Sequence, residues 1–414
     1  MKTKRSVLFM PVIIPALILL QALIFQTSIF GQDRSDANSS ANTTGLDAYL
    51  TNIVASQNYV GLGACLARDG KIIWEGAYGY ADLEAKKGLR KDNIFQLASL
   101  SKVVTAAALM QLYEKGMFKL DDDVNSYIPI KVRNPNFPDK PITFRMLLTH
   151  TAGFDDVLPA GNKLNLGTAG DSPIALSDFV EGLFTPGGKY YSSDYFSKNE
   201  PGTKYGYSNI AFSLIGYIVE KLARKDFSEY CTSAIFKPLG MDNTNWHLKG
   251  LDTGRVVLGY GFPKSDSLNS YRKVRHFGVP GYPEGMLRTT MQDFVKFLSI
   301  FTNKGRYNDY QVLKPETVDL MLTPQGIKNI PTRSFPVKDI GLTWLIFNVD
   351  GEDLYSMNGF SGSIFTNAFF STKDRTIILY YYTGISMKNM QGSFDITKKL
   401  KDSLNKQNVK ADEL

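Results

Sequence analysis

Histidine is scarce in this chain, which has 414 residues and only three histidines: His150, His247 and His276. A Ser-His-Asp triad therefore has few candidates for its general base. The Gly-x-Ser-x-Gly turn that presents the serine of α/β-hydrolases is also missing, because its nearest match, GFSGS at 359–363, ends in serine. These absences argue against triad chemistry, and we expect His150, in the segment LLTHTAGF, to brace a loop.

Metal and cofactor motifs are missing as well. The sequence has no His-Glu-x-x-His and no cluster of cysteine with histidine, so nothing in it indicates a zinc site. Gly61 and Gly63 lack the third glycine and the following helix of a dinucleotide-binding loop. We therefore expect no metal and no cofactor. Cys65 and Cys231 are too few for a disulfide framework; we expect two buried free thiols, although export would also permit them to pair.

A strong excess of charge of one sign is not present either. The formal net charge is +7, and Lys2, Lys4 and Arg5 at the start of the chain account for three of these charges, leaving +4. No basic stripe with interleaved aromatic residues is visible, so nucleic acid is not an expected partner. A content of 43% hydrophobic and 12% aromatic residues is typical of a folded globular protein.

The first 31 residues have the pattern of an export leader. A basic start precedes VLFMPVIIPALILLQALIF, in which Gln21 is the only polar residue. Pro11 and Pro15 favour a cleaved signal peptide, because proline disrupts a stable helix; the run is also long enough for an uncleaved membrane anchor. Residues 32–44 read as a polar linker. In both cases we expect an exported protein, periplasmic or secreted, and attached to the membrane if the leader is retained.

The order of strand and helix patterns indicates an α/β (α+β) protein of two lobes. A short amphipathic helix at 45–57 precedes two strands, VGLGACLARDG and KIIWEGAYGYAD, whose junction at Asp69-Gly70 is a hairpin signal. Residues 99–260 are mostly helical, and strands return from Gly341 onward. The clearest later helices are expected at 208–225, 290–305 and 391–406.

Strands at both ends of the chain with helices between them predict one antiparallel sheet built from both ends and flanked by helices. A mostly helical lobe would lie beside this sheet. We expect a single domain over 45–406 and a polar tail at 407–414. Within the domain, the sheet lobe is expected at about 45–98 and 270–406, and the helical lobe at about 99–269.

Ser99 and Lys102 are the most informative pair of residues. The segment 98–113 is apolar almost all the way round a helix, and Lys102 is its only charged side chain. Positions i and i+3 lie on one helix face, so the two side chains can meet. A desolvated lysine loses its proton more readily and can act as the base that activates a hydroxyl. The amide of Ser99, at the start of the helix, can supply half of an oxyanion hole.

The Ser-x-x-Lys spacing is not specific by itself. It recurs at Ser270–Lys273 and Ser403–Lys406, where polar surroundings explain the lysine. For Lys102 the alternative is a lysine whose stem lies along apolar surface while its amine reaches water at a helix edge. We prefer the functional interpretation, because nothing else in the segment explains a charge there.

Tyr207-Ser208-Asn209 is the second element, placed on a loop that enters a buried helix, and it is the one Tyr-x-Asn in the chain. A phenol near an ammonium can be shifted toward phenolate and relay protons. The Asn209 amide can hold a substrate carbonyl or the lysine. The chain has 22 tyrosines, so packing at the rim of a site is the alternative role for Tyr207.

Four segments, taken together, resemble a known family: QLASLSKVVTAAALMQLYEKGMFKLDDDVNSYIP, ITFRMLLTHTAGF, PGTKYGYSNIAFSLIGYIVEKLA and EGMLRTTMQDFVKFL. The family is the serine β-lactamase and penicillin-binding superfamily, and the class C-like branch with its esterases and D-stereospecific peptidases is the most similar. The likeness extends from about residue 45 to 385. It implies that Ser99 is the nucleophile, Lys102 its base partner, Tyr207 a second proton-handling group and Asn209 part of the same site. It also implies a serine β-lactamase-like fold with the site between two lobes.

The third motif of this family is altered here. The family has a Lys or His, a small residue and a Gly on the strand that lines the site, and the matching segment is YSMNGFSGSIFTNAFF. Placing Gly359 on the glycine puts Met357 at the cation position and Asn358 after it, and makes the amide of Phe360 the second oxyanion donor. Placing Asn358 at the cation position puts Phe360 on the glycine, which fits less well. The cation is missing in both frames, and this affects the expected substrate.

The resemblance implies a serine hydrolase that forms an acyl-enzyme with a small ester, amide or peptide and uses no cofactor, and the leader pattern adds the expectation of export. Esterase or D-amino-acid peptidase activity is the first expectation, and β-lactamase activity the second. The altered third motif leaves a third alternative, a non-catalytic penicillin-binding or cell-wall-binding homologue. The intact Ser99, Lys102 and Tyr207 favour an enzyme.

Overall fold

The computed structural model describes residues 42–156, 164, 166–263, 265, 267–331, 337–349 and 351–411. The leader at 1–31 lies outside these residues, as does most of the linker expected at 32–44; helix α1, Asn42–Ser56, begins at the end of that stretch. Within the described part of the chain, no helix combines the length and the apolar character that crossing a membrane requires.

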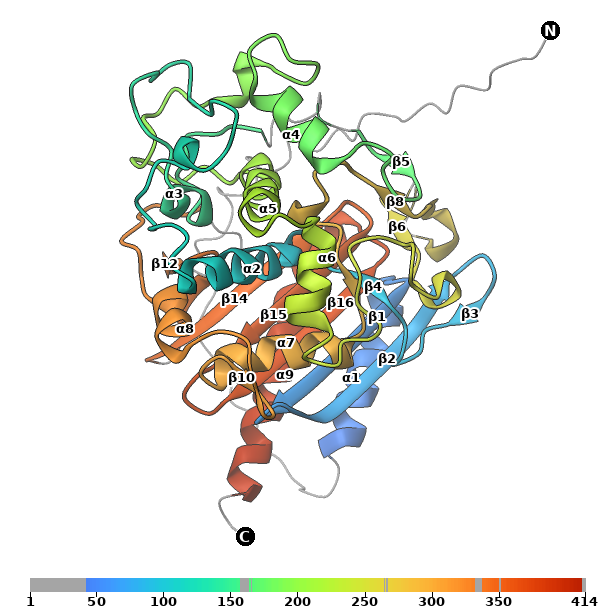
Figure 1. The fold of residues 1–414 in the computed structure, drawn as a ribbon. Helices are drawn as coiled ribbons and strands as arrows, with labels where there is room; N and C mark the ends of the chain where they lie inside the picture. The colour runs from blue at the N-terminus through green and yellow to red at the C-terminus, as the bar shows by residue number, and fades with distance from the viewer. Residues whose placement is uncertain are drawn as a thin grey trace, which may run out of the picture.

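One eight-stranded sheet contains strands from both ends of the chain, drawn in blue and in orange to red in Figure 1. Its order is β12-β13-β14-β15-β16-β1-β2-β3, and each neighbouring pair is antiparallel. The strands are β1 Gly61–Arg68, β2 Lys71–Asp82, β3 Lys87–Gly88, β12 Val337–Ile340, β13 Leu345–Val349, β14 Glu352–Phe360, β15 Ile364–Phe370 and β16 Thr376–Thr383. The predicted antiparallel sheet from both chain ends is confirmed.

The middle of this sheet is buried on both faces. Every residue of β16 is buried, and so is every residue of β1 except Arg68. Burial on both faces explains why these strands have nearly continuous apolar sequences, without strict alternation. The hairpin between β1 and β2 turns at Asp69 and Gly70, whose φ values of 51° and 75° are the left-handed values that a type I′ turn requires.

Helices cover both faces of the sheet (Figure 1). On one face, Leu50 of α1 and Leu400 of α9, Met387–Ala411, share a buried cluster with Tyr380 of the sheet. The larger core lies on the other face, between the sheet and the helical lobe. The helices of that side are α2 Lys102–Glu114, α3 Phe144–Leu148, α4 Leu176–Phe184, α5 Ile210–Ala223, α6 Phe227–Cys231, α7 Met291–Thr302 and α8 Pro315–Leu322.

The structure differs from the sequence-based expectation at a few elements. Strand β12 and helix α8 were not predicted, because both are short and β12 mixes charged with apolar residues. Helix α9, Met387–Ala411, extends beyond the expected 391–406 and into the stretch expected as a polar tail. Cys65 and Cys231 are buried and free, so the expectation of two free thiols is confirmed.

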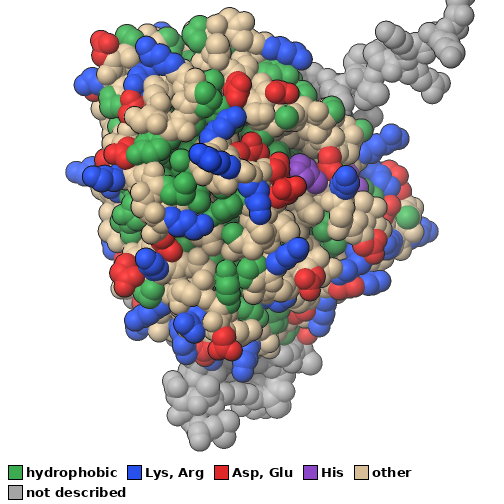
Figure 2. Space-filling model, viewed as in Figure 1, with side chains coloured by type: hydrophobic (Ala, Val, Ile, Leu, Met, Phe, Trp, Pro, Cys, Tyr) green, Lys and Arg blue, Asp and Glu red, His purple; other side chains and the backbone are tan. Residues whose placement is uncertain are grey.

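Charges of both signs are mixed on the surface. Figure 2 shows lysine and arginine side chains interspersed with aspartate and glutamate over the face in view. One of the other Ser-x-x-Lys lysines, Lys273, forms surface ion pairs with Asp82 at 3.0 Å and Glu84 at 3.3 Å. These pairs explain Lys273 without a catalytic role, in contrast to Lys102.

Candidate active site

Ser99 lies in a tight turn that leads directly into a buried helix. The 3-10 turn η2, Ala98–Ser101, is followed without a break by α2. Ala98 has a φ of 48°, a left-handed value that is uncommon for a residue with a Cβ and that recurs at functional sites. Ser99 is partly exposed, whereas Ala98 and Leu100 are buried. The turn therefore keeps the Ser99 side chain accessible at the edge of the core.

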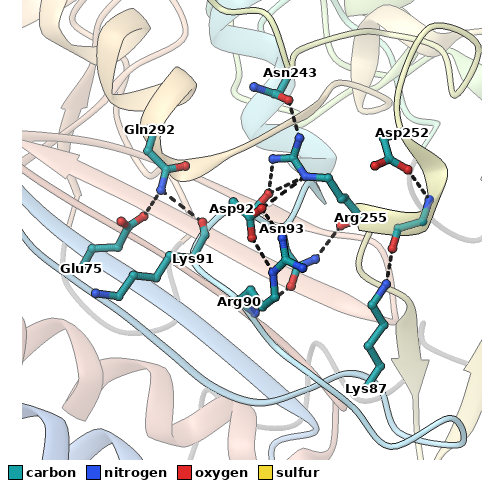
Figure 3. Close-up of polar contacts among 11 residues, drawn as sticks. Glu75, Lys87, Arg90, Lys91, Asp92, Asn93, Asn243, Asp252, Arg255 and Gln292 are labelled. Atoms are coloured by element: carbon teal, nitrogen blue, oxygen red, sulfur yellow. Dashed lines mark hydrogen bonds and ion pairs between the residues drawn. The ribbon is translucent and has the colours of Figure 1, made fainter.

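A polar network holds the segment before this turn (Figure 3). Arg255 donates hydrogen bonds from Nε to the main-chain oxygen of Asp92 at 3.2 Å and from its guanidinium to Asn243 Oδ1 at 2.7 Å. Asn93 donates from Nδ2 to the Arg255 carbonyl at 2.8 Å. These bonds fix the chain shortly before β4, Phe95–Gln96, and thus the approach to Ser99.

Lys102 is fully buried, with an exposed fraction of 0%, and donates three hydrogen bonds. Its Nζ contacts Ser99 Oγ at 3.2 Å, Asn209 Oδ1 at 2.9 Å and the main-chain oxygen of Glu284 at 2.7 Å. The i, i+3 spacing brings Ser99 and Lys102 together even though α2 begins only at Lys102. A lysine that reaches water at a helix edge is excluded by this burial.

Burial changes the acid–base behaviour of Lys102. Desolvation lowers the pKa of Lys102, while the negative charges of Glu284 and Asp156 act in the opposite direction. Three acceptors match the three N–H groups of an ammonium. The geometry therefore holds the charged form, which gives up its proton more readily than a solvated lysine does.

Tyr207 contacts the same serine hydroxyl. Its Oη donates to Ser99 Oγ at 2.6 Å, and Lys102 Nζ lies 5.1 Å from the centre of its ring. Burial raises the pKa of Tyr207, and the charges of Glu284 and Asp156 raise it further. The expected shift toward phenolate is therefore wrong for this site, because desolvation and the two carboxylates outweigh the hydrogen bond with Ser99, which acts in the opposite direction. Tyr207 is a neutral phenol that can donate a proton.

Asp156 fixes the end of the loop that carries Asn209. Asp156 Oδ2 accepts hydrogen bonds from the amides of Asn209 at 2.9 Å and Ile210 at 3.1 Å, where α5 begins. A carboxylate is stabilised at this end of a helix by the free amides and by the helix dipole. Asp156 thereby sets the position from which the Asn209 side chain reaches Lys102.

His150 holds the middle of the same loop. Its Nδ1 accepts a hydrogen bond from the Ser208 amide at 3.1 Å, and its ring centre lies 4.5 Å from that of Tyr207. Burial lowers the pKa of His150 to about 3, so the imidazole is neutral. These contacts support the expectation that His150 braces a loop.

Strand β14 lies directly against the Ser99 turn. A Cβ on Gly359 would stand 2.1 Å from the carbonyl oxygen of Leu97 and 2.9 Å from the amide nitrogen of Leu100, so only glycine allows this approach. Thr366, which pairs with Gly359 on β15, donates from Oγ1 to the same Leu97 oxygen at 2.7 Å. The strand and the turn are thus joined at the residues that flank Ser99.

The alternation of side chains along β14 distinguishes the two frames of the third motif. Gly359 faces the Ser99 turn, so Met357, two residues earlier, faces the same side. Met357 is 5% exposed and belongs to the core between the sheet and the helical lobe. Asn358 is exposed and lies on the opposite face, and the Phe360 side chain packs toward the cluster of α1 and α9. The geometry fits the frame with Met357, and not Asn358, at the cation position.

Two acidic residues beside Lys102 are missing from the sequence-based site. Glu284 lies in the short helix η9, Tyr282–Glu284, and Asp156 in the segment that follows α3; the charges of both act on the pKa of Lys102. No spacing in the sequence connects them with Ser99. The only available signal was that Glu284 opens one of the segments that resemble the family.

Comparison with known sequences agrees with this geometry. The family model described as Beta-lactamase matches residues 46–386. A penicillin-binding protein of Bacillus subtilis (strain 168) is 31% identical over 198 residues, which are 47% of this chain and 40% of that protein. The protein named flp of Staphylococcus aureus (strain MRSA252) is 23% identical over 265 residues, 62% of this chain and 48% of that protein. The matches thus span less than half the length of these curated relatives.

Solved structures share the fold over nearly the whole chain. A D-amino acid amidase from Ochrobactrum anthropi SV3 has a TM-score of 0.71 and 20% identity, with 89% of this chain and 100% of that one covered. A D-alanine carboxypeptidase AmpC from Burkholderia cenocepacia has a TM-score of 0.66 and 16% identity, with 88% and 100% covered. At such identities these likenesses concern the fold. The extent of the family match carries the assignment: the chain belongs to the beta-lactamase family.

Proposed function

We propose that this protein is an exported serine hydrolase that acts through an acyl-enzyme on small esters or amides that carry no carboxylate. The observation that carries the proposal is the convergence of Lys102 Nζ, at 3.2 Å, and Tyr207 Oη, at 2.6 Å, on the hydroxyl of Ser99. Nucleophile and base within hydrogen-bond reach, with the base held by further groups, is the arrangement of an activated serine. A purely structural role does not explain a fully buried lysine beside an accessible hydroxyl.

The chemistry follows from the protonation states. Lys102 first gives up its own proton, which burial makes easier. Ser99 Oγ then bonds to the substrate carbonyl carbon while the neutral Lys102 amine takes the hydroxyl proton. The amides of Ser99 and Phe360 are the candidate donors to the oxyanion. Tyr207, a neutral phenol, protonates the leaving alcohol or amine as its bond to carbon breaks, and regains a proton from Lys102. Water then attacks the acyl-enzyme, and the same groups take its proton and return one to Ser99 Oγ.

Met357 supports the choice of a substrate without a carboxylate. By family resemblance, a lysine or histidine at this position meets a substrate carboxylate or assists proton transfer. A thioether carries no charge and donates no hydrogen bond. A charge-assisted hydrogen bond contributes about 1.5–3 kcal/mol, or about 10- to 150-fold in a rate or binding constant. Anionic β-lactams should therefore be poor substrates, whereas neutral esters never needed this contact. The fold likeness to a D-amino acid amidase makes D-amino acid amides the amides to test first.

Export is the part of the proposal that rests on sequence alone. The leader pattern at 1–31 supports it. Fractionation of cells that express the full chain should place the protein outside the cytoplasm, and a variant without residues 1–31 should remain inside. Equal distribution of the two would contradict export through this segment.

Covalent labelling tests the catalytic assignment. After treatment with a fluorophosphonate, intact-mass analysis should show one adduct, located on the peptide with Ser99. Ser403→Ala alters the Ser-x-x-Lys repeat of α9 and is the matched control, which should still be labelled. Labelling that persists in Ser99→Ala would assign the nucleophile to another residue.

A substrate panel then separates the alternatives. We expect a clearly higher kcat/KM for short p-nitrophenyl esters and D-amino acid amides than for a chromogenic cephalosporin. Rapid cephalosporin hydrolysis would favour a β-lactamase. Slow acylation of Ser99 without turnover of any substrate would favour a penicillin-binding homologue that is not an enzyme.

A further inference from the structure

The short helix η9 is fixed against α2 through its main chain. The carbonyl oxygens of Pro283 and Glu284 accept hydrogen bonds from Thr105 Oγ1 and Lys102 Nζ, both at 2.7 Å. Thr105 is fully buried, as Lys102 is. The backbone of Glu284 is therefore held in place beside the lysine, whatever its side chain does.

The Glu284 side chain belongs to the same cluster. Its Oε2 accepts a hydrogen bond from the buried Ser213 Oγ of α5 at 3.0 Å. Burial lowers the pKa of Lys102 and raises that of Tyr207; the Glu284 charge opposes the first shift and adds to the second. Burial raises the pKa of Glu284, and the Lys102 ammonium acts against this increase. Each member of the pair thus influences the protonation of the other.

We propose that Glu284 is a positioning residue that sets the pH at which Lys102 becomes available as a base. The inference rests on the proposed function of Lys102. In a poorly solvated site, a carboxylate stabilises a neighbouring ammonium, and the loss of either charge leaves the other unpaired. The pair can hold one proton as ammonium with carboxylate, or as amine with carboxylic acid. In the second state Lys102 is a base although the pair has released no proton.

The other titratable groups around Lys102 change their protonation less readily than Glu284 when Lys102 gains or loses a proton. Burial raises the pKa of Asp156 as well, but three hydrogen bonds oppose this increase, among them those that its Oδ2 accepts from two amides at the start of α5. Tyr207 is a phenol whose pKa is raised, and His150, whose ring packs against that of Tyr207, is neutral because burial lowers its pKa to about 3. Among the described residues around Lys102, Glu284 is therefore the carboxyl whose protonation can follow that of the lysine.

The test is the pH dependence of fluorophosphonate labelling of Ser99 in the full chain, from about pH 5 to about pH 10. The wild-type rate should rise with pH as Lys102 loses its proton. Glu284→Gln removes the negative charge, makes the ammonium less favourable and should move this rise to lower pH by about one unit, which is about tenfold faster labelling on the rising limb. Glu284→Asp keeps the charge and should return the limb toward its wild-type position.

Glu220→Gln is the matched control. Glu220 lies on α5 and burial raises its pKa to about 7, but its partner is the amide of Phe227 at 3.1 Å. This variant should leave the limb unchanged. If Glu284→Gln folds and its labelling rate rises at the same pH as that of the wild type, the inference is overturned. If Ser99 of the wild type is not labelled at all, the proposed function is overturned instead.

Ser213→Ala decides the question if Glu284→Gln does not fold. The Ser213 hydroxyl lowers the pKa of Glu284, so its loss makes the neutral carboxylic acid more favourable. The rise of the labelling rate with pH should then move to lower pH, as in Glu284→Gln, but by a smaller amount. An unchanged limb in Ser213→Ala overturns the inference in that case.

Discussion

Gly359→Ala tests whether strand β14 positions the nucleophile. The new Cβ would stand 2.1 Å from the Leu97 carbonyl oxygen, 2.5 Å from Thr366 Oγ1 and 2.9 Å from the Leu100 amide nitrogen. Real Cβ atoms essentially never approach closer than 3.0 Å. Two of these three atoms belong to the main chain and cannot rotate away. The strand and the Ser99 turn must therefore separate by about 1 Å in a close-packed interior.

The expected loss of activity exceeds the expected loss of stability. Overpacking of a core costs about 1–3 kcal/mol in unfolding free energy. A displacement of reacting groups by about 1 Å can lower a rate by about 10²-fold. Separation also lengthens the 2.7 Å hydrogen bond from Thr366 to Leu97, which holds the turn from the same side. We expect Gly359→Ala to fold and to lose about 10²-fold in kcat/KM.

The measurements are kcat/KM for a p-nitrophenyl ester, the rate of Ser99 labelling and the free energy of unfolding in urea. Gly88→Ala is the matched control, because a Cβ on Gly88 meets nothing within 4 Å and this residue lies in the exposed strand β3. It should match the wild type in all three. If Gly359→Ala retains activity within about threefold of the wild type, contact with β14 does not position the hydroxyl and the reasoning is refuted.

Three further substitutions test the roles of individual side chains. Lys102→Arg should be nearly inactive, because a guanidinium does not give up its proton near neutral pH; activity within about tenfold of wild type would make Lys102 structural. Tyr207→Phe keeps the ring but loses the proton donor, and should lower kcat/KM by about 10²-fold or more; a near-neutral effect would reduce Tyr207 to packing. Met357→Lys should raise the cephalosporin-to-ester ratio of kcat/KM by about 10- to 150-fold, and an unmoved ratio would show that this position does not select the substrate.

Local sequence was sufficient for one part of the site. Ser99 and Lys102 lie within one segment, and a charge on an otherwise apolar helix is visible without any tertiary information. Tyr207 and Asn209 required the family resemblance, since neither residue type is unusual in this chain. The choice between Met357 and Asn358 followed from strand alternation, once β14 and its contact with the Ser99 turn were known.

Long-range packing accounts for what the sequence did not reveal. Glu284 and Asp156 approach Lys102 only because η9 packs against α2 and the segment after α3 meets the start of α5, and no periodicity encodes such a meeting. For the same reason, the sequence led us to expect a lowered pKa for Tyr207, whereas its pKa is raised. The ammonium was visible in the sequence, but the desolvation and the two carboxylates that oppose it were not.

The pairing of β1 with β16 has a consequence for synthesis of the chain. The two strands pair along their full length, although they lie near opposite ends of the described sequence. At about 5–20 residues per second, β1 is made roughly 15 to 60 s before its partner. During that interval the β1–β2 hairpin has an open edge that can pair with another chain, and such distant pairing also slows folding. Strand β14 is also synthesised late, so the Ser99 turn gains its contact with this strand only when most of the chain has been translated. A chain that ends before β14 therefore has no assembled site.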